Sequence, residues 1–511
     1  MPAASLPESA LPESTTSYWI ASTSGPGFPE APAELDADVV VIGGGIAGLT
    51  TARQLQLAGR SVVVVEAGRI LEGVTGNTTA KVSTQHGLVY ADLVSSHGES
   101  KARLYADAQG AALEHIAGSG IDCDFARVDS FVYSLDSSEL EKLQGEAEAA
   151  VSLGLPASYT TEVPLPYDVA GAVRFAGQGQ FHPRKYLLAL AAQITDSGGV
   201  ILEGTRALDV DDDDPCVITT DRGVIRARDV VVATHIPFLD RGLYFARQFP
   251  VRDYVVAAPI AASSAPDGIF LSTESPTHSV RTTPYDGGLL LIVAGEGHTP
   301  GREEDTDARY DALGAWAREK FGVSEIAYRW STQDYTSEDR VPFIGPLTKA
   351  SQHIWTATAF GAWGMTNGTV AGLLLSDLIT GRDNPWAEVF DPGRGGAWLQ
   401  RTKKLVTENL SVGKALVSGY LTGGDVSSVD ELAPGEGAVL RFGPAKTACY
   451  RDDSGKVHAV SAKCTHLGCI VAFNSAEKSW DCPCHGSRFD VDGAVLQGPA
   501  VDPLSPASVP D

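Results

Sequence analysis

The sequence predicts a multidomain chain in which a large α/β domain with a parallel sheet precedes a small all-β domain. Three observations lead to this prediction. At 511 residues, the chain is too long for a single hydrophobic core. Near the start, within residues 36–69, a glycine-rich turn lies between two short runs of β-branched residues. Near the end, residues 464–486 hold four of the seven cysteines and two histidines, and short strand-like segments precede them.

The overall composition narrows the class of protein. The net charge of −25 argues against nucleic acid or an anionic membrane surface as a partner. No apolar run has the length of a transmembrane segment. Residues 1–35 begin with a repeated LPES and are rich in Pro, Ser, Glu and Ala, which predicts a disordered lead-in rather than a secretory signal. We therefore expect a cytoplasmic protein.

The glycine-rich turn has the pattern of a phosphate-binding site. Residues 39–42 are a continuous β-branched run, as in a strand that is buried on both faces of a parallel sheet. Gly43 permits a tight turn, Gly45 lets the backbone approach a pyrophosphate, and Gly48 lets a helix pack closely on the strand. The following helix, expected over residues 46–58, directs unpaired N–H groups and a partial positive charge at the phosphates.

A second strand, expected over residues 61–65, ends in Glu66, which can accept hydrogen bonds from both hydroxyls of a ribose. The order of strand, glycines, helix, strand and acid within about 30 residues is that of a dinucleotide site. A glycine-rich turn in an unrelated α/β unit is the alternative. An acid at this place disfavours a 2′-phosphate, so the sequence predicts FAD or NAD rather than NADP.

Residues 36–391 resemble the FAD-dependent amino-acid oxidase (DAO) family, which contains the glycine and sarcosine oxidases. The tracts that carry the resemblance are GVTGNTTAKVSTQHGL (73–88), FHPRKYLLALAAQI (181–194), VIRARDVVVATH (224–235), SEDRVPFIG (337–345) and ATAFGAWGMTNGTVAGLLLSDLITG (357–381). The resemblance implies FAD as the resident cofactor. It also implies a Rossmann-like FAD-binding domain that is interleaved with an α+β substrate domain, whose segments lie near 111–170 and 246–330.

Two of these tracts contribute further candidate residues at the flavin. Gly361, Gly364, Met365 and Thr366 lead into a helix whose N-terminus can face the negative charge of a reduced flavin, so we expect them in the FAD site. His86 is a candidate flavin neighbour, because some family members attach flavin covalently through a histidine in a nearby tract. The alternative for His86 is a hydrogen-bonded histidine that lines the domain.

One departure from the family bears on the substrate. Glycine-oxidase-like members carry an arginine for the substrate carboxylate shortly before the D-x-x-P-x-I-G motif. Gapless alignment on Trp330 and Asp339 places Asp334 at that position. An aspartate repels a carboxylate and attracts an ammonium group, which favours an amine over a simple α-amino acid. Arg281 or Arg340 could supply the missing positive charge from elsewhere.

The cysteine-rich tract predicts a metal centre. Two short loops, Cys464-x-His466 and Cys482-x-x-His485, each offer one thiolate and one imidazole. Imidazole can replace two thiolates on one iron of a [2Fe–2S] cluster. Zinc also accepts two cysteines and two histidines, but in a zinc finger the cysteines pair with each other and so do the histidines. The spacing therefore favours the cluster.

The tract CTHLGC…CPCHGS resembles the Rieske iron–sulfur domain in the form that has a disulfide. The resemblance implies a disulfide between Cys469 and Cys484. The cluster ligands that it implies are Cys464, His466, Cys482 and His485. Short strand-like segments from residue 426 onward predict a small all-β Rieske domain over 426–511. Residues 392–425 mix a Gly/Pro break with helical periodicity and predict a helical connector.

Together the two parts predict an FAD-dependent oxidoreductase that oxidises a C–N bond of an amine or amino acid. A flavin accepts two electrons and the cluster accepts one, so the cluster would pass electrons singly to a ferredoxin, cytochrome or quinone. The alternatives are an oxidase whose Rieske domain serves redox sensing or docking, and electron entry through the cluster. A Rieske oxygenase needs a mononuclear iron held by two histidines and a carboxylate, and no remaining histidines pair at short spacing.

Overall fold

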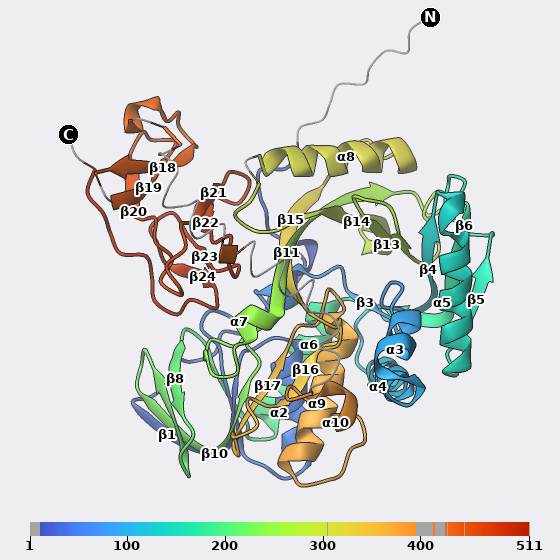
Figure 1. Cartoon of the computed structure of the whole chain (residues 1–511), viewed down its shortest axis with the longest axis horizontal. Coiled ribbons are helices and arrows are strands. Elements are labelled where there is room, and N and C mark those ends of the chain that lie inside the picture. Colours follow the sequence, from blue (N-terminus) through green and yellow to red (C-terminus); the bar gives the residue numbers. More distant parts are fainter. Residues whose placement is uncertain are drawn as a thin grey trace, which may run out of the picture.

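The computed structural model describes residues 11–303, 305–394, 412–413, 425–426, 428–443 and 445–509. The expected helical connector over 392–425 therefore lies almost entirely outside the described residues. Two large sheets and a smaller C-terminal β-body make up the described part of the molecule (Figure 1). The predicted combination of an interleaved α/β flavin fold and a small all-β domain is confirmed.

The first sheet is the α/β body, and β1 lies near its centre. Val39, Val40 and Val41 of β1 are fully buried because the strand is covered on both faces, and β1 pairs in parallel with β2 and β10. In spatial order the main strands are β16 (Phe343–Pro346), β17 (Ile354–Thr358), β10 (Val224–Val232), β1 (Glu34–Ile42), β2 (Val62–Val65) and β7 (Val200–Leu202), with β8 (Ala207–Asp211) and β9 (Cys216–Thr220) attached to β10. The associated helices are α2 (Ile46–Leu57), α6 (Pro183–Asp196), α7 (Tyr244–Arg247), α9 (Gly364–Ile379) and α10 (Ala387–Phe390).

The second sheet draws on two distant stretches of the chain, as an interleaved substrate domain requires. Its spatial order is β15 (Tyr328–Ser337), β11 (Gln248–Ile260), β14 (Gly288–His298), β13 (His278–Tyr285), β12 (Ile269–Ser272), β4 (Ala126–Ser134), β6 (Gly171–Gln180) and β3 (Lys81–Val82), with β5 (Ala157–Thr160) on β6. The accompanying helices are η1 (Val74–Asn77), α3 (Tyr90–His97), α4 (Glu99–Ala117), η2 (Ser137–Glu139), α5 (Leu140–Ser152) and α8 (Asp307–Phe321). Helix α8 packs on β11 and β14 (Figure 1).

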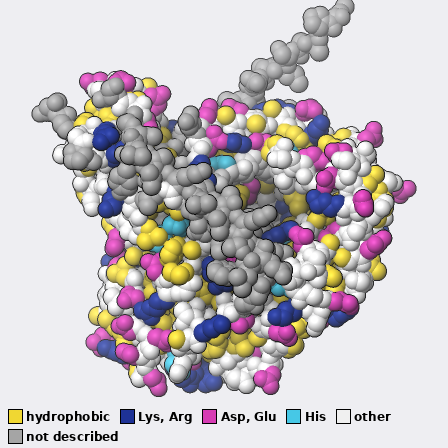
Figure 2. Space-filling view, in the orientation of Figure 1, with side chains coloured by type: hydrophobic (Ala, Val, Ile, Leu, Met, Phe, Trp, Pro, Cys, Tyr) yellow, Lys and Arg dark blue, Asp and Glu magenta, His cyan; other side chains and the backbone are white. Residues whose placement is uncertain are grey.

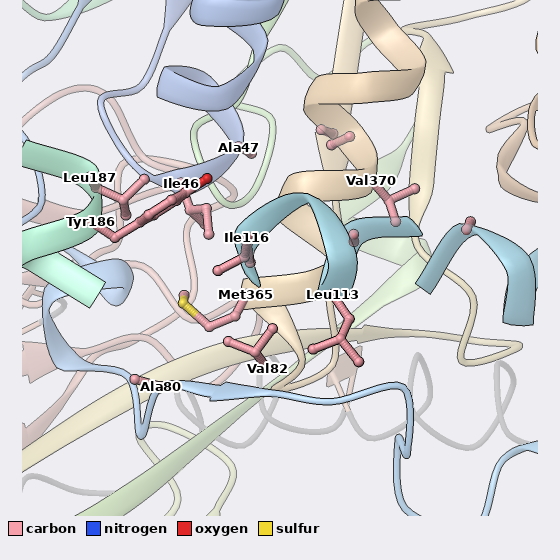
Figure 3. Close-up of a cluster of buried hydrophobic side chains, with 14 of the residues drawn as sticks. Ile46, Ala47, Ala80, Val82, Leu113, Ile116, Tyr186, Leu187, Met365 and Val370 are labelled. Carbon is pink, nitrogen blue, oxygen red and sulfur yellow. The ribbon is translucent and has the colours of Figure 1, made fainter. Parts of the chain in front are cut away.

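A shared hydrophobic core joins the two sheets. Ile46 at the start of α2, Met365 at the start of α9 and Ile116 at the end of α4 converge there with Val82 of β3 (Figure 3). All four are at most 4% exposed. The core therefore holds the two helix starts next to the first strand of the second sheet.

The C-terminal body consists of two antiparallel sheets. One is β18 (Gly437–Phe442), β19 (Ala445–Arg451) and β20 (Val457–Ser461), preceded by η3 (Val429–Glu431); the other is β21 (Ala472–Asn474), β22 (Ser479–Asp481), β23 (Arg488–Phe489) and β24 (Val495–Gln497). This body lies beside α7 and the ends of β11 and β15 (Figure 1).

On the face shown in Figure 2, basic side chains are scattered among acidic ones, and the acidic excess is not gathered into one patch. Among the described residues, no helix combines the length and apolar character needed to cross a bilayer.

Residues 11–35 do not form the disordered lead-in that composition suggested, and residues 1–10 of that stretch lie outside the described part. Helix α1 (Tyr18–Ala21) places Trp19 in the core with no exposed surface. The Trp19 indole N–H donates to Thr78 O at 2.6 Å, and Ser17 Oγ donates to Gly76 O. The composition rule failed because Trp19 is buried in a core built by distant segments, and hydrogen bonds that span 59 residues hold it there with Ser17.

Replacing Trp19 by alanine is therefore expected to destabilise the flavin domain by about 3–5 kcal/mol, the usual loss when a large buried aromatic side chain is removed. Urea unfolding followed by circular dichroism measures the change. Leu57→Ala is the control, because Leu57 is 63% exposed and its loss should cost less than about 0.5 kcal/mol. Equal unfolding midpoints for the two variants would contradict the anchoring role of Trp19.

Candidate functional site

The glycine-rich turn after β1 has the geometry of a phosphate-binding turn. Gly43 has φ 114°, in the left-handed region, and a Cβ at Gly48 would lie 1.9 Å from Gly43 O. Only glycine fits at both places. Helix α2 then begins with Gly45 as its N-cap residue and without a cap from that residue's own side chain; Ile46 N donates to Thr75 Oγ1 at 3.2 Å, which leaves the next N–H groups of the first turn for a phosphate.

Glu66 follows β2 and lies beside this turn. Its carboxylate accepts hydrogen bonds from Gly44 N and Gly68 N, both at 2.9 Å. Burial raises the pKa of Glu66, and the two backbone donors oppose that rise. The acid is therefore held at the mouth of the turn, where a ribose would follow the phosphates.

A cavity of about 980 Å³ opens from the turn, near the upper end of the ~300–1,000 Å³ of small-molecule sites. Its walls come from the turn, from β11, β13 and β15 of the second sheet, and from the C-terminal body. The predicted cofactor residues that line it are Gly43, Gly45, Glu66, Gly364 and Met365. The other three, Gly48, Gly361 and Thr366, lie outside this lining and shape the backbone behind it.

His86 does not line the cavity. Its Nε2 donates to Ser83 O at 2.9 Å and lies 3.0 Å from Thr366 Oγ1, while its Nδ1 lies 2.6 Å from the Tyr105 hydroxyl. Burial lowers the pKa of His86 to about 3, so the ring is neutral. With both nitrogens engaged by protein groups, these contacts support the hydrogen-bonded interpretation rather than flavin attachment.

Asp334 does line the cavity, but its carboxylate is already engaged. It accepts hydrogen bonds from His235 Nε2 at 3.0 Å, from its neighbour Tyr335 N at 2.7 Å, and from Ala362 N at 2.5 Å. Ala362 lies just before α9, so Asp334 fixes the approach to that helix. With these three partners, Asp334 is a positioning residue in this structure.

Neither candidate substitute for the family arginine lines the cavity. Arg281 is buried and donates to the backbone carbonyls of Thr79, Ala80, Phe181 and Thr282. Arg340 forms a salt bridge of 3.0 Å with Asp92, away from the cavity.

The cavity residues that were not identified from the sequence include Lys81, Arg252, Asp253 and Ser279. A signal was present, since VRDYVV places adjacent charged residues inside an otherwise apolar strand. Among the described residues, no hydrogen bond or salt bridge engages the Asp253 carboxylate, whereas Arg252 pairs with Glu477 of the C-terminal body at 3.2 Å. The structure thus brings charged and polar side chains from three strands, together with Glu477, to one space.

The cysteine–histidine tract forms a second site in the C-terminal body. The imidazole rings of His466 and His485 lie with centroids 5.0 Å apart. Cys464 and Cys482 are buried and close enough for a hydrogen bond between their side chains, which lowers the pKa of Cys464 to about 7. The two predicted histidine ligands are therefore neighbours, and so are the two predicted cysteine ligands.

Cys469 and Cys484 form a disulfide with a Cα–Cα distance of 6.5 Å. The bridge joins the two ligand loops, and the Cys482 sulfur lies within 4.8 Å of both disulfide sulfurs. Since the bridge sulfurs are bonded to each other, they are not available as thiolate ligands.

The donor set fits a [2Fe–2S] cluster. The Nδ1 atoms of His466 and His485 are buried and have no hydrogen-bond partner among the described residues. Two orphaned imidazole nitrogens beside two thiols are the ligands that a Rieske cluster needs. Asp240 accepts a hydrogen bond of 3.1 Å from His466 Nε2, which leaves Nδ1 of that ring for the metal.

The two sites share an interface. The Tyr335 hydroxyl donates to His485 O at 3.0 Å, and Gln333 Nε2 donates to Gly486 O at 2.8 Å. Gln497 Nε2 donates to His235 Nδ1 at 3.1 Å, and the same His235 bonds Asp334. One chain of hydrogen bonds therefore leads from the start of α9 to β24 of the C-terminal body, and separate bonds join β15 to the ligand loop.

An aromatic side chain closes this interface at the histidines. Phe245 of α7 lies edge-on to His466 and His485, at 5.4 Å and 5.2 Å. The α/β body thereby covers the imidazole ligands with an apolar ring.

Comparisons with known proteins agree with these two sites. The family model described as FAD dependent oxidoreductase matches residues 38–378, and the model described as Rieske [2Fe-2S] domain matches residues 424–508. The Rieske 2Fe-2S iron-sulfur protein YhfW of Bacillus subtilis (strain 168) is 38% identical over 500 residues, which cover 96% of this chain and 97% of that protein.

Two further comparisons concern the part of the chain that precedes the C-terminal body. Gamma-glutamylputrescine oxidoreductase of Escherichia coli (strain K12) is 26% identical over 404 residues, which cover 75% of this chain and 92% of that protein. The crystal structure of glycine oxidase from Geobacillus kaustophilus superposes with a TM-score of 0.59 at 20% identity, over 71% of this chain and 100% of that chain. At this identity the structural likeness shows the fold alone.

Proposed function

The chain belongs to the FAD dependent oxidoreductase family and carries a Rieske [2Fe-2S] domain. We propose that this protein oxidises a C–N bond of an amine and passes the electrons one at a time through the cluster to an external acceptor. The observation that carries the proposal is the single cavity lined both by the glycine turn and by residues 497, 498 and 500 beside the cluster.

The charges in the cavity support an amine as the substrate. Asp253 is a half-buried carboxylate on the cavity wall, and desolvation, with a further contribution from nearby Asp334, raises its pKa to about 6. A substrate ammonium would supply the positive charge that such a carboxylate needs. Arg252 already pairs with Glu477, so it is not free for a substrate carboxylate. The name of the E. coli relative, gamma-glutamylputrescine oxidoreductase, is that of an enzyme acting on a putrescine derivative.

The interface supports an internal electron route. FAD, when bound, accepts a hydride from the carbon next to nitrogen. Tyr335 and Gln333 hold the His485 loop against the strand whose other residues line the cavity. Because hydrogen bonds join β15 to the His485 loop, the distance between the cavity and the cluster is fixed by the interface rather than by diffusion of two separate domains.

The test is an anaerobic titration of the purified protein with a panel of amines and amino acids. We expect one amine to bleach the flavin absorbance and to raise a rhombic EPR signal of reduced cluster. Flavin takes two electrons and the cluster one, so complete reduction should need about 1.5 equivalents of a two-electron donor.

Other outcomes separate the alternatives. A bleached flavin beside an oxidised cluster would overturn the internal relay and favour a sensing or docking role. If no amine is active and a cluster that has been reduced with dithionite passes electrons to the flavin, electrons enter the protein through the cluster. An amino acid that works where the matching decarboxylated amine does not would overturn the preference for amines.

A further inference from the structure

Lys81 is a half-buried lysine on the cavity wall, and the proposed oxidation does not yet assign it a role. It opens β3 at the edge of the second sheet. Its Nζ donates to Thr79 Oγ1 at 2.9 Å and to Ser279 Oγ at 2.7 Å. In the described part of the chain, no salt bridge joins Lys81 to a carboxylate. A hydroxyl provides no counter-charge, so an ammonium at this position is poorly compensated.

The charged groups around Lys81 also influence its protonation. Arg281 approaches from β13, and its guanidinium contacts backbone carbonyls, including Thr79 O and Ala80 O. Asp253, from β11, is the opposing charge. Burial first, and Arg281 second, lower the pKa of Lys81 to about 7 against the effect of Asp253. Near neutral pH, a substantial fraction of Lys81 is therefore the free amine.

We propose that Lys81 is the base that takes a proton from the substrate ammonium before the C–N bond is oxidised, an inference that rests on the proposed function. The two N–H bonds of the free amine serve Thr79 and Ser279, so its lone pair is left for the cavity. One N–H bond of the substrate ammonium breaks and one N–H bond forms on Lys81 Nζ. The step is a proton transfer without oxidation or reduction, and it leaves the substrate as the neutral amine.

This step meets a requirement of the chemistry. An aliphatic amine is protonated at neutral pH, with a pKa similar to the ~10.4 of a free lysine. Loss of hydride from the adjacent carbon leaves a cation, and the nitrogen lone pair must be free to stabilise it. Asp253 attracts the ammonium into the cavity, and Lys81 then removes its proton. The alternative role is a permanently charged Lys81 that anchors a substrate anion. That role predicts that Lys81→Arg, which keeps the charge, stays active.

The experiment compares Lys81→Met and Lys81→Arg with the control Lys142→Met. Lys142 is 61% exposed and pairs with Glu139, on a helix outside the cavity lining. The rate constant of flavin reduction at saturating amine is measured by anaerobic stopped flow across neutral pH. Both Lys81 variants should lose about 100-fold or more, and the control should lose nothing.

The pH profile identifies the base. In the wild type, the rate should rise with pH as Lys81 loses its proton, and this rise should be absent from Lys81→Met. An active Lys81→Arg variant would overturn the proposal in favour of an anion anchor, since arginine keeps the charge but cannot accept a proton.

A second readout does not depend on turnover. Acetic anhydride labels free amines, so at pH 7 Lys81 should be acetylated faster than Lys142, as measured by peptide mass spectrometry on the intact holoenzyme. A saturating amine should protect Lys81. Slower labelling of Lys81 than of Lys142 in the absence of substrate would overturn the claim that Lys81 is a free amine near neutral pH. Fast labelling in a protein whose flavin no amine reduces would instead locate the failure in the proposed substrate class, not in the state of Lys81.

Discussion

Replacing Cys482 by serine is expected to remove the cluster while leaving FAD bound. Iron should fall from about two atoms per chain to near zero, because the cluster loses a thiolate ligand that serine replaces poorly. The rhombic EPR signal should vanish with the iron. The glycine turn that would hold the FAD phosphates lies in the α/β body, away from the ligand loops, so the flavin absorbance and its bleaching by substrate should persist.

The functional consequence is the stronger test. Reduction of a one-electron acceptor should fall to background, although each amine still delivers its two electrons to flavin. Cys123→Ser is the matched control, because Cys123 is equally buried but lies in the first body, without the ligand loops around it. Undiminished reduction of the acceptor by the Cys482→Ser variant would show that electrons leave the flavin directly.

Replacing Gly48 by valine is expected to abolish FAD binding. The first atom of the new side chain would lie 1.9 Å from Gly43 O, a backbone atom that cannot move without opening the turn. Either α2 shifts away from β1 or the turn unfolds, and both destroy the arrangement of N–H groups toward the phosphates. FAD released per chain, measured by absorbance after denaturation, should fall at least about tenfold.

The control for this variant is Gly110→Ala. Gly110 lies in α4, and a Cβ there would have no atom within 4 Å. Alanine also has the higher helix propensity, by about 1 kcal/mol, so this variant should keep its flavin and gain slightly in stability. Normal FAD content in Gly48→Val would contradict the assignment of the glycine turn to the dinucleotide.

The α/β body covers the predicted histidine ligands of the cluster. Phe245 contacts both His466 and His485, and Asp240 accepts a hydrogen bond from His466. The interface with the α/β body is therefore part of the surroundings of these two imidazoles.

The sequence by itself determined the parts whose chemistry depends on local spacing. The spacing of Gly43, Gly45 and Gly48 sets how closely a backbone can approach a phosphate, whatever the remainder of the chain does. The two ligand loops likewise each carry one thiolate and one imidazole within four residues. Such signals survive without tertiary information because the atoms that act together are neighbours along the chain.

Other assignments needed the three-dimensional arrangement. The sequence placed Asp334 at the substrate, but His235, which is 99 residues away, and Ala362 N engage its carboxylate. The disordered lead-in was wrong over residues 11–35, since the burial of Trp19 depends on a core that distant strands build.

Lys81 shows most plainly what the tertiary structure alone decided. Its partner Ser279 is 198 residues away on β13, the same strand carries Arg281, and Asp253 approaches from β11. The protonation of a buried lysine depends on desolvation and on charges within a few ångströms. Those quantities arise only when strand register brings distant residues together, so no spacing rule along the chain could have predicted them.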